Sequence, residues 1–234
     1  NLDSLVPHIV GPHTPDLARP ITELKHDAEK NNYPVVISNA LIGSCTNSSY
    51  EDIGRAAYIA REAAKKGLKS KVPLMVTPGS EVTRATIERD GYLKDLESIG
   101  ATVLANACGP CIGQWKRDDI GEGEINSIVS SYNRNFPARN DGNKETLSFI
   151  GSPESVIGLA LGGSLDFDFL NDSLINDSGE EVKLTPPIAE ELPLEGFANT
   201  LEGFIQPTPG NDIEVVIDPE SNRLQRLTPF EAPK

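Results

Sequence analysis

Three cysteines are the residues of this chain whose type and spacing most clearly permit chemistry. Cys108 and Cys111 form a Cys-x-x-Cys pair, and the Gly-Pro dipeptide between them fits the tight turn that lets two thiolates reach one metal centre. Cys45 lies far away in the sequence, within residues 43–48. An odd number of cysteines fits a disulfide framework poorly, so we expect a reducing compartment and a metal, cluster or redox role.

Several kinds of site fit three cysteines. Zinc takes four ligands, but the only histidines, His8, His13 and His26, lie near the start of the chain with no cysteine beside them. Thioredoxin-like redox chemistry would use the Cys-x-x-Cys pair and leave Cys45 idle. A [4Fe–4S] cluster normally takes four thiolates, so three would leave one iron open to water or substrate oxygen. A buried, inert Cys45 beside an incidental pair is also consistent with the spacing, and spacing alone leaves all four interpretations open.

A second candidate site is the run of residues 133–141, which follows a predicted strand. Arg134 and Arg139 each offer a planar guanidinium fork suited to a carboxylate, so together they could hold a substrate with two or more carboxylates. The alternative is a solvated turn in which these arginines pair with Asp141 or Asp118.

The elements that must position these residues alternate between strands and helices, which predicts an α/β domain with a mostly parallel sheet in three αβα layers. We expect strands at 35–42, 72–76, 102–104 and 125–130, and helices at 21–30, 51–66, 80–89, 92–99 and 152–161. Loops at the carboxyl ends of parallel strands form the sites of open α/β sheets. The two cysteine loops and the arginine run should therefore converge at one edge.

Prolines crowd both ends of the chain, which sets the expected organisation. Residues 1–32 are predicted to be an extended lead-in, 33–175 the α/β domain, and 176–234 an extended Pro-rich tail with strand-like pieces such as Ile213–Ile217. The net charge of −14 argues against nucleic acid as a partner. No run of about 18 apolar residues exists, so no membrane span is expected.

Longer stretches around the candidate residues resemble the aconitase family. Residues 43–52, GSCTNSSYED, resemble its signature around the first cluster cysteine, and residues 105–115, ANACGPCIGQW, resemble the signature that holds the other two. SYNRNF at 131–136, with Arg139 beyond it, is similar to the family's substrate-arginine segment, and VTPGSE and ATIERDGY also match. The GPCIGQW form resembles the mitochondrial type of the family, which implies the mitochondrial matrix.

The resemblance implies a ligand set and a reaction. Cys45, Cys108 and Cys111 would hold a [4Fe–4S] cluster in which one iron lacks a protein thiolate. That iron would bind the hydroxyl and a carboxylate of a small tricarboxylate, citrate or isocitrate. The reaction would be the hydro-lyase reaction of the tricarboxylic acid cycle, removal and re-addition of water through cis-aconitate.

The resemblance also implies roles for the polar residues around the cluster. Arg134 and Arg139 would grip substrate carboxylates, and Asn133 and Asn47 would lie near the cluster. No motif for the family's acid or base groups occurs here, so no catalytic acid or base is expected in this chain.

Two departures from the family pattern limit these expectations. Pro137-Ala138 stands where the family often has a Thr-Gly-type pair, which leaves the homoaconitase reaction, homocitrate to homoaconitate, open. The chain matches only the third, cluster-ligating domain, and its tail resembles the start of the linker to the last domain. We therefore expect the remaining aconitase domains as partners in cis and no activity from the isolated chain. A non-catalytic cluster-binding scaffold is the other alternative.

Overall fold

The computed structural model describes residues 1–43, 45–201, 204–211, 214 and 216–221. The chain divides into two compact units, residues 1–200 and residues 201–234. The strand-like piece expected at Ile213–Ile217 includes residues outside the described ranges. No helix in the described part of the chain is long and apolar enough to cross a membrane.

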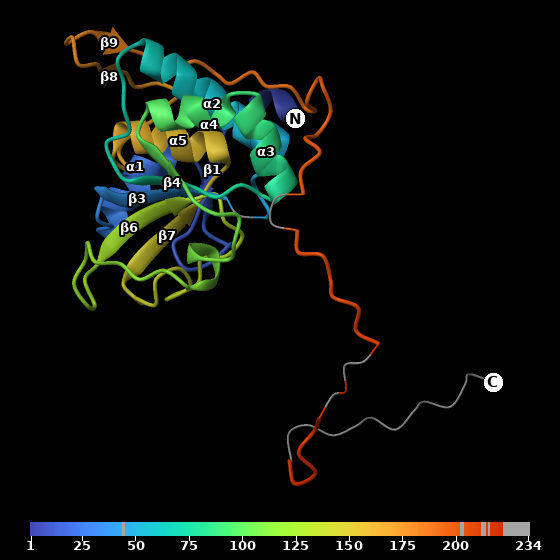
Figure 1. The fold of residues 1–234 in the computed structure, drawn as a ribbon. Helices are drawn as coiled ribbons and strands as arrows, with labels where there is room; N and C mark the ends of the chain where they lie inside the picture. Colours follow the sequence, from blue (N-terminus) through green and yellow to red (C-terminus); the bar gives the residue numbers. More distant parts are fainter. Residues whose placement is uncertain (44, 202–203, 212–213, 215, 222–234) are drawn as a thin grey trace. The chain divides into compact units, whose positions relative to one another are not determined.

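A seven-stranded sheet forms the centre of the first unit (Figure 1). Its strand order is β2-β1-β7-β6-β3-β4-β5, and all neighbours from β7 to β5 pair in parallel. β1 runs antiparallel to both β2 and β7. The predicted α/β class with a mostly parallel sheet is confirmed. The strands are β1 His8–Val10, β2 Ala18–Pro20, β3 Ile37–Ile42, β4 Leu74–Val76, β5 Ala101–Val103, β6 Asn126–Ser130 and β7 Thr146–Ile150.

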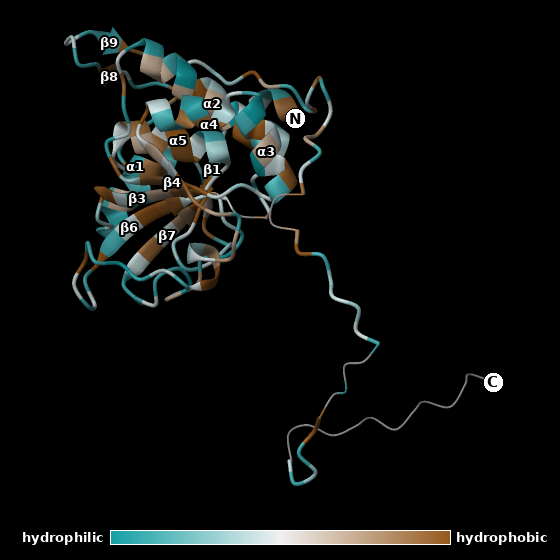
Figure 2. Ribbon diagram, in the orientation of Figure 1, coloured by the Kyte–Doolittle hydropathy of each residue, from teal (hydrophilic) through white to brown (hydrophobic). Residues whose placement is uncertain are grey.

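Five α-helices form a layer on one face of this sheet (Figure 1). They are α1 Ile21–Asn31, α2 Tyr50–Lys65, α3 Glu81–Arg89, α4 Tyr92–Ser98 and α5 Pro153–Gly162. α2 begins at a capping box in which the side chains of Ser49 and Asp52 each bond the other's backbone N–H. α5 is buried along almost its whole length because it packs against both β3 and α2. Figure 2 accordingly shows hydrophobic colour over α5 and the central strands.

The opposite face of the sheet is covered by chain with little regular structure. Side chains alternate along β3, so Ala40 and Ile42 join the large core under the helices while Leu41 faces a second, smaller core. The smaller core also holds Cys111 and Tyr132. The second helical layer predicted for an αβα arrangement is not found among the described residues on this face, which is covered instead by the 3-10 turn η2, Pro110–Ile112, and the irregular segments around it.

The first 32 residues contribute β1, β2 and α1, together with the 3-10 turn η1, Leu2–Ser4. β2 contains Pro20 and is one of the two edge strands of the sheet, where a missing N–H is tolerated. After α5 the chain adds a small antiparallel pair, β8 Leu174–Ile175 and β9 Glu181–Val182. The compact unit then continues to Thr200, so residues 176–200 belong with the sheet rather than with the remaining tail.

Candidate cluster and carboxylate site

The predicted site residues lie in loops that leave the sheet at the carboxyl ends of its parallel strands. The chain passes from β3 to β4 on one side of β3 and later returns with β6 on the other side, so the strand order reverses between β3 and β6. Cys45 follows β3, Cys108 follows β5, and Asn133 and Arg134 follow β6. Ligand sites of open α/β sheets lie at such a reversal. The expectation that these loops share one edge is met.

Hydrogen bonds join the loop of Cys45 to the loop that follows β6. The hydroxyl of Ser131 accepts from the Gly43 backbone N–H at 3.0 Å and donates to the Gly43 carbonyl at 3.2 Å. Asn47 Nδ2 donates to the Ser131 carbonyl at 2.5 Å, and Asn133 Nδ2 donates to Thr46 Oγ1 at 3.3 Å. Both asparagines predicted to lie near the cluster therefore tie the two loops together.

Gly43 fixes where the Cys45 loop starts. Its φ of +135° is a conformation that side chains rarely adopt, and a Cβ there would stand 2.7 Å from the Thr77 carbonyl oxygen. Ser48, at the far end of the same loop, donates its hydroxyl hydrogen to that carbonyl at 2.9 Å. The loop is thus pinned at both ends against the residue that follows β4.

The other cysteine loop packs on the same β6 loop. Cys111 lies in η2, is buried, and belongs to the smaller core together with Tyr132. Burial raises the pKa of the Tyr132 hydroxyl above its ordinary value, and the nearby Cys111 raises it further. The phenol therefore stays protonated at neutral pH. Tyr132 lies between Ser131 and Asn133, so three consecutive residues contact both cysteine loops.

The three thiols differ in exposure. Cys45 and Cys108 are exposed and Cys111 is buried, and none of the three forms a disulfide. Cys45 Sγ lies 4.0 Å from Thr46 Oγ1. Within the described residues, no three or more His, Cys, Asp or Glu side chains gather closely enough to hold a metal ion. The sulfurs thus share an edge of the sheet without forming a closed ligand set, and their thiol chemistry suits iron–sulfur ligation.

The two predicted arginines differ in their surroundings. Arg134 is exposed, and its NH1 donates to the Asn133 carbonyl at 2.8 Å. Arg139 is partly buried, with its guanidinium carbon 5.2 Å from the centre of the Phe136 ring. Arg139 Nε is buried and has no hydrogen-bond partner among the described residues. A buried donor without an acceptor costs free energy, so an acceptor that reached this N–H would be favoured.

The acids that could have neutralised these arginines have other partners. Asp141 binds Arg117 at 3.2 Å, and Asp118 faces Lys116 at 3.8 Å. The alternative of a turn in which Arg134 and Arg139 pair with these acids is therefore not what the structure shows. Sequence reasoning missed Arg117, since nothing in its local sequence distinguishes a buried arginine from a surface one.

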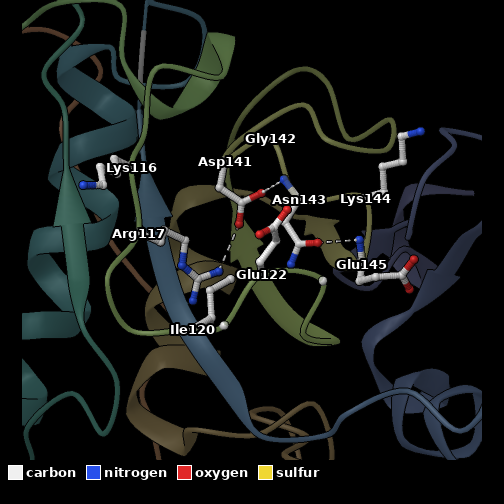
Figure 3. Close-up of a pocket in the computed structure, with 11 residues that line it drawn as sticks. Lys116, Arg117, Ile120, Glu122, Asp141, Gly142, Asn143, Lys144 and Glu145 are labelled. Atoms are coloured by element: carbon white, nitrogen blue, oxygen red, sulfur yellow. Dashed lines mark hydrogen bonds and ion pairs between the residues drawn. The ribbon is translucent and has the colours of Figure 1, made fainter.

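A hollow of about 590 Å³ lies among the segments that lead into β6 and β7 (Figure 3). Its walls are the residues that precede β6 and those that precede β7, so it lies near the amino ends of these strands. The residues that line it are Lys116, Arg117, Ile120, Gly121, Glu122, Gly123, Asp141, Gly142, Asn143, Lys144 and Glu145. None of the predicted cluster or substrate residues is among them.

Comparison with known proteins adds the family. Residues 1–163 match the family model described as "Aconitase family (aconitate hydratase)". "Probable aconitate hydratase, mitochondrial" of Dictyostelium discoideum is 52% identical over 231 residues, which cover 98% of this chain and 30% of that protein. "Aconitate hydratase, mitochondrial" of Saccharomyces cerevisiae is 52% identical over 233 residues, with the same coverage. The chain thus spans about 30% of the length of these relatives.

Proposed function

Because the chain belongs to the aconitase family, we propose that it is the cluster-binding part of a mitochondrial aconitate hydratase. Its substrate would be a small tricarboxylate, and its partners the remaining domains of the same protein. The observation that carries the proposal is the segment Ser131–Asn133, which contacts both cysteine loops at the carboxyl edge of the sheet. The names of the relatives support the reaction and the compartment.

Cys45, Cys108 and Cys111 are the residues that would hold a [4Fe–4S] cluster. When bound, such a cluster supplies a Lewis-acidic iron for the substrate's oxygen atoms, because three thiolates leave one iron without a protein ligand. The exposed Cys45 and Cys108 can turn toward a shared centre, while Cys111 is already fixed in the smaller core. Asn47 and Asn133 would keep the Cys45 loop against the β6 loop.

Arg134 and Arg139 would bind the carboxylates. The exposed Arg134 is available to an incoming anion, and Arg139 Nε offers a buried N–H that has no partner in the part of the chain that the structure describes. A carboxylate accepting from a guanidinium fork is held in a defined orientation as well as attracted by charge. These two residues would therefore orient the substrate for water removal. The groups that move the protons would come from the rest of the protein, so the isolated chain should not turn over substrate.

The turn between the arginines bears on substrate choice. Ala138 has a φ of +62°, a conformation in which glycine is favoured and alanine is strained. This turn lies between Arg134 and Arg139, so its shape would affect how the two guanidinium groups are spaced and hence the choice between citrate and homocitrate, the substrate of the homoaconitase alternative.

A chimera tests this function. The chain would replace the matched segment of the Saccharomyces cerevisiae relative, and conversion of citrate and of homocitrate would be followed by absorbance of the unsaturated product. We expect turnover of citrate by the chimera, and none by a Cys45→Ser chimera or by the isolated chain. An iron-loaded chimera that turns over neither substrate would support the scaffold alternative. Preference for homocitrate would support the homoaconitase alternative.

A further inference from the structure

Arg117 is a buried arginine in the segment that follows the Cys108–Cys111 loop. Its side chain is 2% exposed, and every N–H group of its guanidinium has an acceptor. The acceptors are Asp119 Oδ1 (3.0 Å, from Nε), Asp119 Oδ2 (2.6 Å, from NH2), Ser38 Oγ (3.1 Å, from NH2), Asn126 Oδ1 (2.7 Å, from NH1) and Asp141 Oδ2 (3.2 Å, from NH1). These partners connect the segment to β3, to β6 and to the chain that enters β7.

Asp141 is the buried partner of this arginine (Figure 3). Its side chain is also 2% exposed, and it accepts from Thr146 Oγ1 at 2.7 Å and from the Asn143 backbone N–H at 3.0 Å. Breaking a buried ion pair by removing one partner leaves an uncompensated charge, which strongly favours the paired geometry. The Arg117–Asp141 pair therefore holds the segment after the Cys108–Cys111 loop against the segment that leads into β7.

The two loops touch at further points along their length. Asn140 Nδ2 donates to the Pro110 carbonyl at 3.1 Å, next to Cys111. A Cβ on Gly113 would stand 3.1 Å from the Arg139 carbonyl oxygen, so these backbones pack closely. The segment from Pro110 to Arg117 thus lies alongside the segment from Arg139 to Asp141.

We propose that the Arg117–Asp141 ion pair is a positioning device that sets the Cys111 loop against the Arg139 segment. This inference rests on the proposed function, in which Cys111 is a cluster ligand and Arg139 binds a substrate carboxylate. The pair touches neither cluster nor substrate and acts through the two loops that it joins. Trp115 supports it, since its ring centre lies 4.9 Å from the Arg117 guanidinium carbon and its side chain packs on the core of Cys111.

Arg19 offers a matched control within the same unit. Its side chain is 8% exposed and its Nε lies 3.1 Å from Asp27 Oδ2, so it too is a buried arginine paired with an aspartate. Arg19 lies on β2, at the edge of the sheet next to β1, away from both cysteine loops. Removal of either arginine should destabilise the fold, but only removal of Arg117 should change the surroundings of Cys111.

The test is site-resolved alkylation of the metal-free chain, followed by mass spectrometry. In the wild type we expect fast labelling of the exposed Cys45 and Cys108 and slow labelling of the buried Cys111. Arg117→Met and Asp141→Asn should accelerate labelling of Cys111 by about tenfold, because the loop opens more often. Arg19→Met should leave the Cys111 rate as in the wild type. Asp141→Asn is the milder change, and it keeps the comparison intact if Arg117→Met does not fold.

Iron binding supplies the second readout. After anaerobic reconstitution, Arg117→Met and Asp141→Asn should hold less iron per chain than Arg19→Met. Unchanged Cys111 labelling in both variants, or equal acceleration in Arg19→Met, would overturn the positioning role. A wild-type chain that binds no iron while its variants show the predicted acceleration would count against the cluster in this chain, and would leave the positioning role standing.

Discussion

At the residue scale, small polar residues and glycines hold together the loops at the carboxyl edge of the sheet, although these residue types do not suggest catalysis. Ser131 is fully buried and makes hydrogen bonds to both backbone groups of Gly43. The sequence motifs indicated the cysteines and arginines directly, since their chemistry is distinctive. They could not show that Ser131 connects the loops, because a serine after a strand is common and its partner is distant in sequence.

Ser131→Ala tests this connection. The substitution would leave the buried Gly43 N–H and carbonyl without their partner, so we expect a loss of about 1–3 kcal/mol in the free energy of unfolding, measured with urea. Ser98→Ala is the control, because the exposed Ser98 hydroxyl also donates to a backbone carbonyl but lies at the end of α4. A loss in Ser131→Ala no larger than that in Ser98→Ala would contradict the connecting role.

The carboxylate grip gives a second prediction at this scale. Arg139→Lys keeps the positive charge but removes the buried Nε donor and the planar fork. In the chimera we expect KM for citrate to rise by on the order of tenfold, since a hydrogen bond to a charged group is lost. Arg61→Lys, in the α2–α4 ion pair, is the control. Equal KM values for the two variants would exclude Arg139 as a carboxylate ligand.

At the element scale, helices with clear start signals were predictable from sequence. Ser49 with Asp52 marks the start of α2, and Ser152 before Pro153 marks that of α5. The predicted strands at β3, β4, β5 and β6 are also confirmed within a few residues. β7, Thr146–Ile150, was not predicted, because its polar Thr146 and Ser148 interrupt the apolar run expected of a buried strand, although both are buried in the sheet.

The covering layer opposite the helices was the least predictable element. It has little regular structure and many polar contacts. Its sequence therefore lacks the hydrophobic periodicity from which helices and strands are predicted. Asp119 illustrates this: Arg117, and to a lesser extent Asn39, hydrogen-bond its carboxylate and hold its pKa below the ordinary value, although partial burial acts in the opposite direction. No local pattern of charges indicates such partners.

The lowered pKa of Asp119 predicts a pH dependence. A carboxyl whose folded pKa is depressed stabilises the fold fully above its unfolded pKa, and this contribution is lost as the pH falls through the folded pKa. The free energy of unfolding should therefore fall between about pH 5 and about pH 2, and Asp119→Asn should show a shallower fall. Urea titrations at several pH values measure this. An equally steep fall in the free energy of unfolding at acid pH in the wild type and in Asp119→Asn would contradict the Arg117–Asp119 interaction.

At the scale of the whole molecule, the chain spans about 30% of the length of its relatives, and the proposed cluster ligands and carboxylate-binding arginines lie within this span. One edge of the sheet collects the cysteine loops and Arg134, while the network around Arg117 holds the covering layer to the strands. The family could be inferred from the motifs, and the parallel sheet from the alternation of elements. The sequence also predicted that the cysteine loops converge; they share one edge of the sheet, but within the described residues the three cysteines do not form a group close enough to hold a metal ion.

Anaerobic reconstitution with iron and sulfide tests the central claim most directly. Iron and sulfide would be counted per chain, with visible and EPR spectra, for the wild type and for Cys45→Ser. We predict about four irons per wild-type chain, falling to about three on mild oxidation with a [3Fe–4S] signal, and loss of the cluster in Cys45→Ser. Zinc bound in preference to iron, or an iron content that Cys45→Ser leaves unchanged, would contradict a cluster held by these three cysteines.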